Sequence, residues 1–430
     1  MLAKLQEEKV FKDPVHSAIY VQDITIWKLI NTPEFQRLRR IRQLGTSYLT
    51  FHGAEHSRFS HSLGVYEITR KIISQFERNG YTDWPQEERL LSLCASLLHD
   101  VGHGPFSHSL EEVFHTHHEE WTCEIILGDT EINRVLAEVS SDFPGDVASV
   151  IRKTYHKPIV VSLVSSQMDA DRMDYLLRDA YFTGVNYGTF DLDRILRVLR
   201  PYQGKIVVKE SGMHAVEDYL MSRYQMYWQV YFHPVTRSSE IVLRQIFRRA
   251  GELKREGYAF AFMLPAIAHL LEGTLNLSHY LMLDESCVQT AFRQWELEED
   301  ALLSNLCSRF LNRQLYKYTP LEDKDEAWLA DAREEWRSIG LNPDYHLEVD
   351  TPYDSPYDIY KPELLPGSRG KLPILLLDER EQLTEISVKS DIIRSIAGIH
   401  RGKYYIYYPD DEVRKHILRL SSETRNKLSI

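Results

Sequence analysis

The residues best suited to metal chemistry are a histidine and an aspartate that stand side by side at the end of an apolar run. Residues 90–98 are largely apolar, and His99 and Asp100 follow them directly. A glycine-rich turn comes next and carries two more imidazoles, His103 and His108. Neutral imidazole together with carboxylate suits a borderline or hard divalent cation. The stretch therefore predicts a metal site, and a buried histidine beside a capping aspartate is the simpler alternative.

Two distant residues offer further ligands to the same cation. His61 lies near the start of a helix predicted over residues 58–76, and Asp171 lies in a second dense stretch of charged residues. Asp171, Tyr175 and Asp179 recur every four residues, so a helix would present them on one face. An ordinary salt-bridged surface helix shows the same spacing, and a single helical histidine is often structural. One carboxylate from this helix would complete a ligand set around the adjacent histidine and aspartate.

A run of histidines offers a candidate proton donor. Glu111 lies in a predicted helix, and His115, His117 and His118 follow it. Such a run usually indicates a metal-binding tract or a solvated face. An imidazole placed beside a metal-bound phosphate would instead act as a general acid.

Two helices carry side chains that suit a nucleotide, although each has a simpler reading. Arg37, Arg39, Arg40 and Arg42 crowd along a helix that is predicted to begin at the Thr32-Pro33 cap. They form either a solvated face or an anion-binding patch, because the guanidinium fork matches phosphate. A long helix over residues 214–232 combines Arg223 with aromatic residues, which form either a core stripe or a pocket that stacks a base and holds a phosphate. The aromatic residues are Tyr224, Tyr227, Trp228 and Tyr231.

The elements that position these residues are mainly helical. An extended segment over residues 9–22 is broken by a turn at Asp13-Pro14, and helices follow to about residue 340. From Asp344 an irregular loop with Tyr353, Pro362 and Gly367 precedes shorter elements. These are predicted strands at Pro373–Leu377, Glu385–Val388 and Lys403–Tyr408 and a helix near Asp391–Ala397. We expect a mainly α fold, with a helical domain over residues 1–340 and a small α+β C-terminal lobe over residues 341–430.

The composition restricts the class of partner. The chain has 51 basic and 63 acidic residues, a net charge of −12, so it lacks the basic balance expected of a nucleic-acid-binding surface. Its four cysteines are far apart without a CxxC pair, which indicates free thiols in a reducing compartment. The N-terminus has no signal-peptide pattern, and the longest apolar stretch, Ala259 to Leu271, is too short to span a bilayer. We expect a cytoplasmic protein with no membrane partner.

The motifs taken together resemble those of the HD-domain phosphohydrolases. The set His61, His99-Asp100 and Asp171 is similar to the metal site of that family. The longer strings 35–39, 58–65 and 99–108 resemble the deoxynucleoside triphosphate (dNTP) triphosphohydrolases within it, over about residues 9–235. The vertebrate member joins a sterile-alpha-motif to its HD domain, and we expect a bacterial-type member without that motif. The resemblance implies an HD-domain helical bundle.

The resemblance also implies roles for individual residues. His61, His99, Asp100 and Asp171 would hold one divalent metal ion, for which Mn, Fe, Ni, Zn and Mg are candidates. His118 matches the catalytic histidine and Glu111 the carboxylate that partners it, with His117 as the nearest rival. The triphosphate would be surrounded by Arg58, His103, His108, Arg172 and Arg223. The sugar would contact Gln43, Leu44, Tyr175, Asp179 and Tyr231, with Asp179 at the 3′-hydroxyl.

A regulatory nucleotide site of the family has a partial match. Lys9, Val10, Gln36 and Arg39 agree with it, whereas Asn31 and Lys12 stand where relatives carry Asp and Asn. An amide accepts from the N–H edge of guanine less well than a carboxylate does. The resemblance therefore implies a deoxynucleotide activator whose base preference is open, and it implies a homotetramer with nucleotide sites at its interfaces.

The activity implied by the resemblance is hydrolysis of dNTPs to deoxynucleoside and inorganic triphosphate. Water would attack the α-phosphorus, the 5′-oxygen would leave, and His118 would protonate it. Two alternatives remain open. The first is another HD-type reaction by a phosphodiesterase, a monophosphatase or an alarmone hydrolase. The second is a non-catalytic nucleotide sensor, for which a general acid would serve no purpose.

Overall fold

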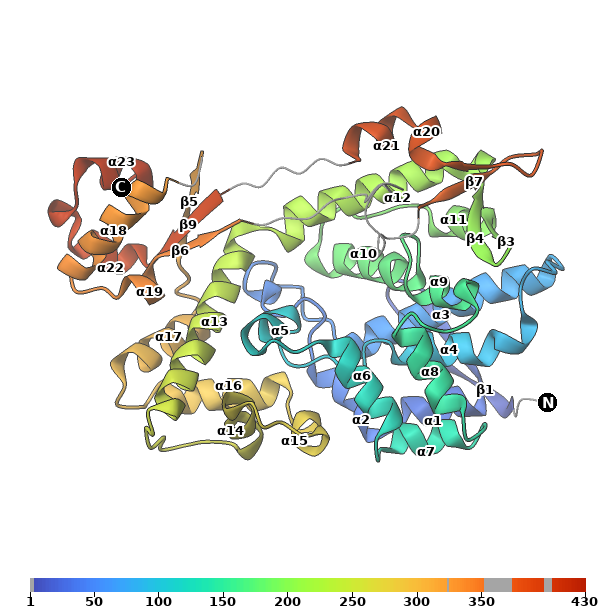
Figure 1. The fold of residues 1–430 in the computed structure, drawn as a ribbon, viewed down its shortest axis with the longest axis horizontal. Helices are drawn as coiled ribbons and strands as arrows, with labels where there is room; N and C mark the ends of the chain where they lie inside the picture. Colours follow the sequence, from blue (N-terminus) through green and yellow to red (C-terminus); the bar gives the residue numbers. More distant parts are fainter. Residues whose placement is uncertain (1–3, 323–324, 352–372, 398–403) are drawn as a thin grey trace.

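The computed structural model describes residues 4–322, 325–351, 373–397 and 404–430. Helices account for 59% and strands for 12% of the structure, and short strands gather in the C-terminal region. The prediction of a mainly α fold with a small sheet-containing C-terminal region is therefore confirmed. The molecule is elongated, with the N-terminal hairpin at one end and the C-terminus at the other (Figure 1).

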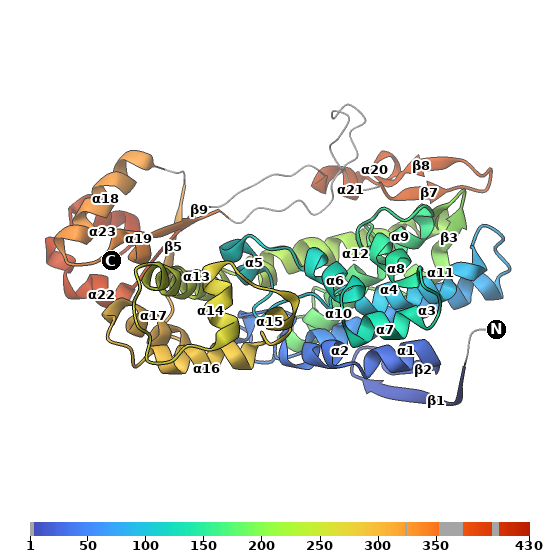
Figure 2. The ribbon, with the colours of Figure 1, turned by 60° about the horizontal axis from the view of Figure 1, so that its bottom comes forward.

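The chain begins with an antiparallel hairpin of β1 (Lys4–Asp13) and β2 (Ser17–Asp23). Its turn is stabilised by the Asp13 carboxylate, because Oδ1 accepts hydrogen bonds from the backbone N–H groups of Val15 and His16, each at 2.9 Å. The predicted turn at Asp13-Pro14 is confirmed. In Figure 2 the hairpin lies along the outside of the first helices.

A bundle of helices follows and surrounds the largest apolar core. The stripe predicted on residues 58–76 is confirmed, because Val65, Ile68, Ile72 and Phe76 are buried in that core. The bundle contains α1 (Ile24–Ile30), α2 (Pro33–Arg37), α3 (Arg58–Arg78), α4 (Arg89–Leu98), α5 (His108–Phe114), α6 (His118–Leu127), α7 (Glu131–Ala137), α8 (Phe143–Ile151), α9 (Pro158–Val164), α10 (Ala170–Thr183), α11 (Leu192–Val198) and α12 (Met213–Met226). Short 3₁₀ turns join it at η1 (Leu38–Arg40), η2 (Ser47–Leu49), η3 (Gln86–Glu88) and η4 (Glu210–Gly212), and a π-helical turn, η5 (Tyr227–Tyr231), extends α12.

The helix predicted from Thr32-Pro33 begins where expected but is short. Thr32 Oγ1 accepts from the backbone N–H of Phe35, and Pro33 occupies the first helical position. Helix α2 ends at Arg37, and the chain tightens into the 3₁₀ turn η1. Its arginines are neither one solvated face nor one anion patch, because Arg37 is buried whereas Arg40 and Arg42 pair with Asp284 and Glu285.

A second helical layer packs beside the bundle around its own apolar core. It contains α13 (Pro234–Arg255), α14 (Pro265–Glu272), α15 (Leu277–Leu281), α16 (Glu285–Trp295) and α17 (Ala301–Leu311). Phe247, Phe292, Trp295 and Phe310 form the centre of this core. Helix α13 runs along the length of this layer and contacts β5 of the C-terminal region (Figure 1). Its first turns lie at the cavity described below.

The C-terminal region forms two sheets that join segments far apart in the sequence. One sheet has the order β3 (Leu199–Tyr202), β4 (Lys205–Lys209), β7 (Leu375–Leu377) and β8 (Leu383–Glu385), followed by α20 (Ile386–Lys389) and α21 (Asp391–Ile396). The other has the order β5 (Lys317–Leu321), β9 (Tyr404–Tyr408) and β6 (Glu348–Asp350). Around the second sheet lie α18 (Glu326–Ser338), α19 (Pro343–His346), α22 (Asp410–Lys415), η6 (Ile417–Arg419) and α23 (Ser422–Leu428).

Several predictions for the C-terminal region are corrected or confirmed by these elements. The strands at Pro373–Leu377 and Lys403–Tyr408 and the helix near Asp391–Ala397 are confirmed within a few residues. The strand predicted at Glu385–Val388 is wrong, because Glu385 ends β8 and its carboxylate caps α20 by accepting from the N–H of Ser387 at 2.8 Å. The predicted irregular loop with Tyr353, Pro362 and Gly367 lies outside the described residues. The prediction of helices alone from the N-terminal hairpin to residue 340 is wrong at β3, β4 and β5.

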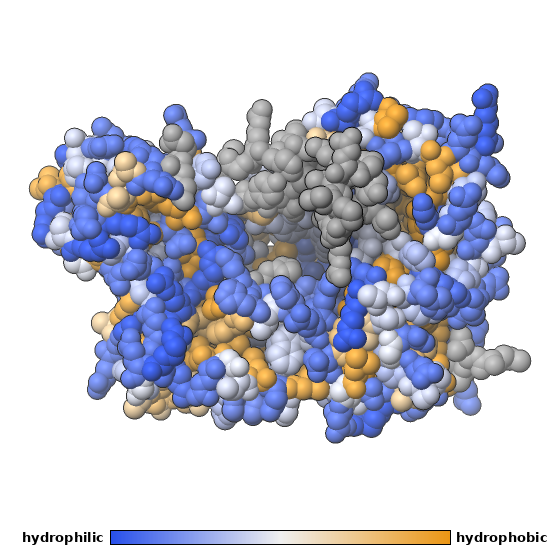
Figure 3. Space-filling view, in the orientation of Figure 1, coloured by the Kyte–Doolittle hydropathy of each residue, from blue (hydrophilic) through white to orange (hydrophobic). Residues whose placement is uncertain are grey.

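The surface in the orientation of Figure 1 is mostly hydrophilic, with apolar side chains scattered in small groups (Figure 3). In the described segments, no helix combines the length and the apolar character that crossing a bilayer requires.

Candidate metal centre and substrate cavity

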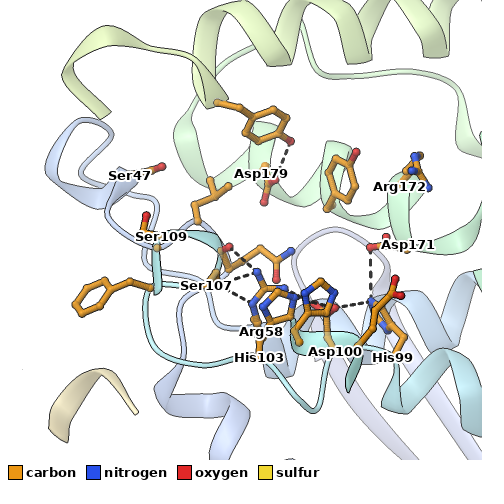
Figure 4. A pocket seen from close by; sticks show the side chains of 18 of the residues that line it. Ser47, Arg58, His99, Asp100, His103, Ser107, Ser109, Asp171, Arg172 and Asp179 are labelled. Carbon is orange, nitrogen blue, oxygen red and sulfur yellow. Dashed lines mark hydrogen bonds and ion pairs between the residues drawn. The ribbon is translucent and has the colours of Figure 1, made fainter. Parts of the chain in front are cut away.

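A cavity of about 510 Å³ opens between the helical bundle and the start of α13 (Figure 4). Its volume is in the range of small-molecule sites. The predicted site residues on its wall are Gln43, Leu44, Arg58, His99, Asp100, His103, His118, Asp171, Arg172, Tyr175, Asp179 and Tyr231. Residues from α3, from the turn after α4, and from α6 and α10 therefore meet at one cavity although they span more than a hundred positions of sequence.

Two imidazoles and two carboxylates converge at one side of the cavity. The Nε2 atom of His61 lies 3.1 Å from Asp171 Oδ1 and 3.7 Å from Asp100 Oδ2. The Nε2 atom of His99 lies 3.3 Å from Asp100 Oδ1 and 3.6 Å from Asp171 Oδ1. His61 is fully buried at the base of this group, and its ligand atom, with those of His99 and Asp171, lies within 4.8 Å of the others. The structure thus brings together the four side chains predicted as ligands.

The orientation of the His99 ring shows that these residues fit a cation. Its Nδ1 lies 2.9 Å from the carbonyl oxygen of Ser96, which can only accept, so Nδ1 carries the proton in the neutral ring. The buried Nε2 is then an acceptor that faces carboxylate oxygens and has no hydrogen-bond partner among the described residues. Acceptors that converge in this way are matched by a divalent metal ion.

The electrostatics of His61 agree with this conclusion. Burial disfavours a charged ring, but hydrogen bonds to Asp171 and Asp174 raise the pKa of His61 to about 10. A site that holds a proton so strongly is one in which positive charge is stabilised.

Sequence reasoning missed the residue that orients His61. Asp174 Oδ2 lies 2.8 Å from His61 Nδ1, and the same carboxylate accepts from Arg178 and contacts His16 Nε2 at 2.6 Å. All of these side chains are buried. A Cβ at Gly64 in α3 would overlap Asp174 Oδ1, so only glycine allows the two helices to approach this closely. A glycine inside a helical pattern was the available signal.

The loop between His99 and α5 is held in an unusual backbone path. Phe106 and Ser107 adopt φ of 56° and 50°, which costs of order 1–3 kcal/mol for each such residue, and Ser107 Oγ accepts from Arg58 at 2.8 Å and 3.0 Å. The buried Arg37 donates to the carbonyl oxygens of His103 and Leu283, each at 2.9 Å. Hydrogen bonds from Arg58 and Arg37 therefore hold the strained loop on two sides, beside Asp100.

His118 and Glu111 form the predicted pair. The Glu111 Oε1 atom lies 2.7 Å from His118 Nδ1 and accepts from the backbone N–H of His118 at 2.8 Å. The His118 ring stacks on His103, with centroids 3.8 Å apart. Glu111 itself does not line the cavity. His117, the rival, is the residue before α6 and is not on the wall of this cavity.

A glycine also sets the contact between His103 and His118. A Cβ at Gly102 would overlap the backbone of α6 at His118 and Thr122, so the loop approaches this closely only without a side chain. Burial and the positive charges of Arg58 and His118 hold the pKa of His103 well below its ordinary value. His103 is therefore neutral near pH 7.

The predicted phosphate ligands are only partly at the cavity wall. Arg58 lines it while donating to Asp100 and Ser107, and Arg172 lines it while pairing with Asp169. Arg223 is 1% exposed and does not line the cavity; its guanidinium lies over the ring of Tyr227 at 5.5 Å. The side chain of His108 lies outside the described part of the structure.

The predicted sugar contacts gather around Asp179. Its Oδ2 accepts from the hydroxyl of Tyr231 at 2.8 Å, and its Oδ1 lies 2.7 Å from Nε2 of His56, a residue that sequence reasoning did not single out. Tyr175 packs edge-on against Tyr231. The aromatic stripe of residues 214–232 is thus divided, because Tyr227 and Tyr231 line the cavity and Tyr224 and Trp228 do not.

The predicted regulatory residues lie apart from this cavity. Arg39 Nε donates to Gln36 Oε1 at 2.8 Å, and the Arg39 guanidinium lies over the Phe59 ring at 3.6 Å. Lys9 and Val10 are on β1, where Val10 is half exposed. Asn31 donates to the carbonyl oxygen of Trp27. Whether these residues bind a nucleotide stays a prediction.

A helical bundle that presents imidazoles, carboxylates and arginines to one cavity has the architecture of a metal-dependent phosphohydrolase. Comparison with known proteins agrees: the HD domain model matches residues 58–179, and the model of the HD associated region matches residues 190–339. The chain belongs to the HD-domain family and is an HD-type phosphohydrolase.

Relatives and solved structures support the same family. The uncharacterized protein YwfO of Bacillus subtilis is 57% identical over 95% of this chain and 94% of its own length. Deoxynucleoside triphosphate triphosphohydrolase SAMHD1 of Gallus gallus is 28% identical over 56% of this chain and 45% of its own length. The crystal structure of a phosphohydrolase from Bacteroides thetaiotaomicron is 28% identical, with a TM-score of 0.82, and the match covers 94% of this chain and all of that one.

Proposed function

We propose that the protein hydrolyses dNTPs to deoxynucleoside and inorganic triphosphate. The observation that carries this proposal is that three kinds of group meet at one cavity: the His61–Asp171 cluster, the guanidinium groups of Arg58 and Arg172, and the Asp179–Tyr231 pair. Relatives named as deoxynucleoside triphosphate triphosphohydrolases support the substrate class.

One divalent ion would be held by His61, His99, Asp100 and Asp171. Bound there, it supplies a Lewis acid and lowers the pKa of water for attack on phosphorus. The ligand set of nitrogen and oxygen admits Mn, Fe, Ni, Zn and Mg. Asp174 fixes the His61 ring through Nδ1, and the carbonyl of Ser96 fixes His99 in the same way.

Positive and neutral donors then surround the phosphate groups. Arg58 and Arg172 present guanidinium groups to the cavity, and neutral His103 offers a hydrogen bond without adding charge. Such donors stabilise the charge that spreads over the phosphoryl oxygens in the transition state. The resemblance alone adds Arg223 and His108 to this set of phosphate ligands.

His118 would donate the proton to the leaving 5′-oxygen. The carboxylate of Glu111 accepts from Nδ1, which would stabilise the doubly protonated ring whose Nε2–H is the transferable proton. Asp179, held by Tyr231 and His56, would accept the sugar 3′-hydroxyl, with Gln43, Leu44 and Tyr175 completing that part of the wall.

The regulatory expectations belong to the same proposal. A nucleotide activator would bind at Lys9, Val10, Gln36 and Arg39, and the active form would be a cytoplasmic homotetramer without membrane or nucleic-acid partners. Size-exclusion chromatography with light scattering, with and without dNTPs, tests the assembly.

Product analysis tests the activity. The metal-loaded protein is incubated with each dNTP, alone and with a second dNTP, and the products are separated by chromatography. The proposal expects deoxynucleoside and intact triphosphate. Release of monophosphate and pyrophosphate, or of orthophosphate alone, would assign another HD-type reaction. Binding without turnover in the presence of each candidate metal would assign a sensor.

A further inference from the structure

One end of the cavity lies away from the proposed metal ligands His61, His99, Asp100 and Asp171. Its wall has polar side chains that the proposed reaction does not use. In Figure 4, Ser47 and Ser109 lie on the side opposite Asp171 and Arg172. Three cavity-lining residues of α13 lie at this same end, because hydrogen bonds join the start of α13 to Thr46 and Thr50, on either side of Ser47. These residues are Thr236, Arg237 and Glu240.

Two side-chain hydrogen bonds fix the start of α13 against the segment that carries Ser47. The hydroxyl of Ser239 donates to Thr46 Oγ1 at 2.8 Å, and the hydroxyl of Thr236 donates to Thr50 Oγ1 at 3.0 Å. Thr46 and Thr50 flank η2 on either side. The first turns of α13 therefore form the cavity wall beside Ser47.

Arg237 and Glu240 are held rigidly in this wall. Arg237 donates through Nε and Nη2 to both oxygens of Asp350 on β6, at 2.7 Å and 2.8 Å, and through Nη1 to Glu240 Oε2 at 2.6 Å. The side chains of Arg237, Glu240 and Asp350 are only 20%, 22% and 10% exposed. A carboxylate and a guanidinium thus face the cavity in one fixed arrangement, and a strand of the C-terminal region supports it.

The position of this pair identifies what it would contact. If phosphates lie at Arg172 and the sugar lies at Asp179, the base is the part of a nucleotide that extends toward Ser47 and α13. A base edge offers N–H donors and carbonyl acceptors, which are complementary to a carboxylate beside a guanidinium. Resting on the proposed function, we propose that Glu240 and Arg237 read the substrate base and favour guanine.

Guanine fits best for a chemical reason. Its N1–H and N2–H groups are adjacent and parallel, so the carboxylate of Glu240 can accept from both, while the neighbouring O6 accepts from Arg237. Adenine and cytosine offer one amino group, and thymine offers one N–H between two carbonyl oxygens that a carboxylate repels. A bidentate base contact is typically worth a factor of about 10 or more in discrimination.

The test is the ratio of kcat/KM for dGTP to that for dTTP in the wild type and in Glu240→Gln. We expect the wild type to prefer dGTP and the substitution to lower the ratio about tenfold. A ratio cancels any loss of folded protein, because that loss scales the values for both substrates equally. Glu240→Asp, which retracts the carboxylate by one methylene group, is the second variant and is expected to lower the ratio as well.

Glu252→Gln is the matched control. Glu252 lies on the same helix and pairs with arginines, but it does not line the cavity. Equal changes for all four dNTPs in Glu240→Gln, or a wild-type preference for dTTP, would overturn the inference.

Equilibrium binding of each dNTP to the metal-loaded protein separates this inference from the proposed function. A base preference in binding that depends on Glu240, without release of triphosphate, supports the inference and contradicts the proposed reaction. Release of triphosphate from dNTPs, with the same dGTP-to-dTTP ratio of kcat/KM in Glu240→Gln as in the wild type, supports the proposed reaction and contradicts the inference. No binding of any dNTP contradicts both.

Discussion

At the scale of single residues, the site depends on which ring nitrogen carries the proton. In His61, His99 and His118 the Nδ1 atom is engaged by Asp174, by the Ser96 carbonyl and by Glu111 respectively. The Nε2 atoms of His61 and His99 therefore face the carboxylates of Asp171 and Asp100, and that of His118 is left for the proposed proton transfer. Neighbours that orient a ring are as important as the ring itself.

The first prediction concerns His118 as general acid. His118→Ala is expected to lower kcat by roughly 10²–10⁴-fold, because the leaving oxygen loses its proton donor, with little change in nucleotide binding. Steady-state kinetics and equilibrium binding on the same preparation measure the two effects. His117→Ala is the control and should retain activity. If His117→Ala loses turnover and His118→Ala retains it, the roles are reversed.

The second prediction concerns Asp174. Asp174→Asn keeps the shape but removes the charge that holds His61, so metal affinity is expected to fall by about 10–100-fold. Titration of the metal-free protein, followed by calorimetry, measures it. Asp169→Asn, which changes another buried aspartate of this stretch, is the comparison and should affect Arg172 more than the metal. Unchanged metal affinity in Asp174→Asn would show that His61 is oriented by its helix alone.

At the scale of elements, the loop between α4 and α5 is shaped by contacts from outside it. Arg37 on α2 donates to the carbonyl of His103, and the hydroxyl of Tyr280 on α15 donates to the carbonyl of Gly102 at 2.5 Å. Helix α6 contributes the hydroxyl of Thr122, which accepts from the Gly102 N–H at 3.0 Å. The loop thus takes its strained path because three elements satisfy its buried backbone groups.

The third prediction tests this support. Arg37→Met removes the hydrogen bonds to the buried carbonyls of His103 and Leu283 and a longer one to that of Val101, at a cost of about 3 kcal/mol, and releases His103 from its position beside His118. Thermal unfolding should show a lower Tm, and kcat should fall more than KM rises. Arg40→Met is the control: its partner is an aspartate, but Arg40 is 52% exposed and the pair is worth about 1 kcal/mol or less. Equal losses in both variants would contradict a specific role for Arg37.

The sequence predicted elements better than it predicted their neighbours. The helix with Asp171, Tyr175 and Asp179 on one face, the apolar helix before His99 and the stripe on α3 all follow from periodicity, which is a local property. The roles of Asp174, His56 and Arg37 do not, because each depends on a contact across the fold that no local pattern encodes. Arg223 shows that a motif match does not fix a residue's position either, because Arg223 is buried and does not line the cavity.

At the scale of the whole molecule, the C-terminal region is joined to the helical part through several contacts. Strand β7 pairs with β4, and Leu376, Ile386 and Ile393 are buried in the core of the helical bundle. Strand β5 comes before residue 340 and pairs with β9, which comes after it. The division at residue 340 stays a prediction, and these pairings indicate that a cut there would separate bonded strands.

The fourth prediction follows from those pairings. Burying an aliphatic side chain contributes about 1.5–3 kcal/mol, so losing Leu376, Ile386 and Ile393 alone would cost about 5–9 kcal/mol, comparable to the entire stability of a typical domain, about 5–15 kcal/mol. A fragment of residues 1–340 is therefore expected to unfold at a much lower temperature or to aggregate.

Circular dichroism melting and size-exclusion chromatography of two fragments distinguish the contribution of β7 to α21 from that of the sheet that contains β9. Residues 1–397 keep β7, β8, α20 and α21 and lose β9, whereas residues 1–340 lose both groups. We expect the longer fragment to retain the folded bundle and its metal affinity. Strand β6 loses its partner β9 in this fragment, so we also expect Arg237 to lose the support of Asp350 on β6. If residues 1–340 melt within a few degrees of the full chain, the helical domain is independent, and the strand pairings contribute little to its stability.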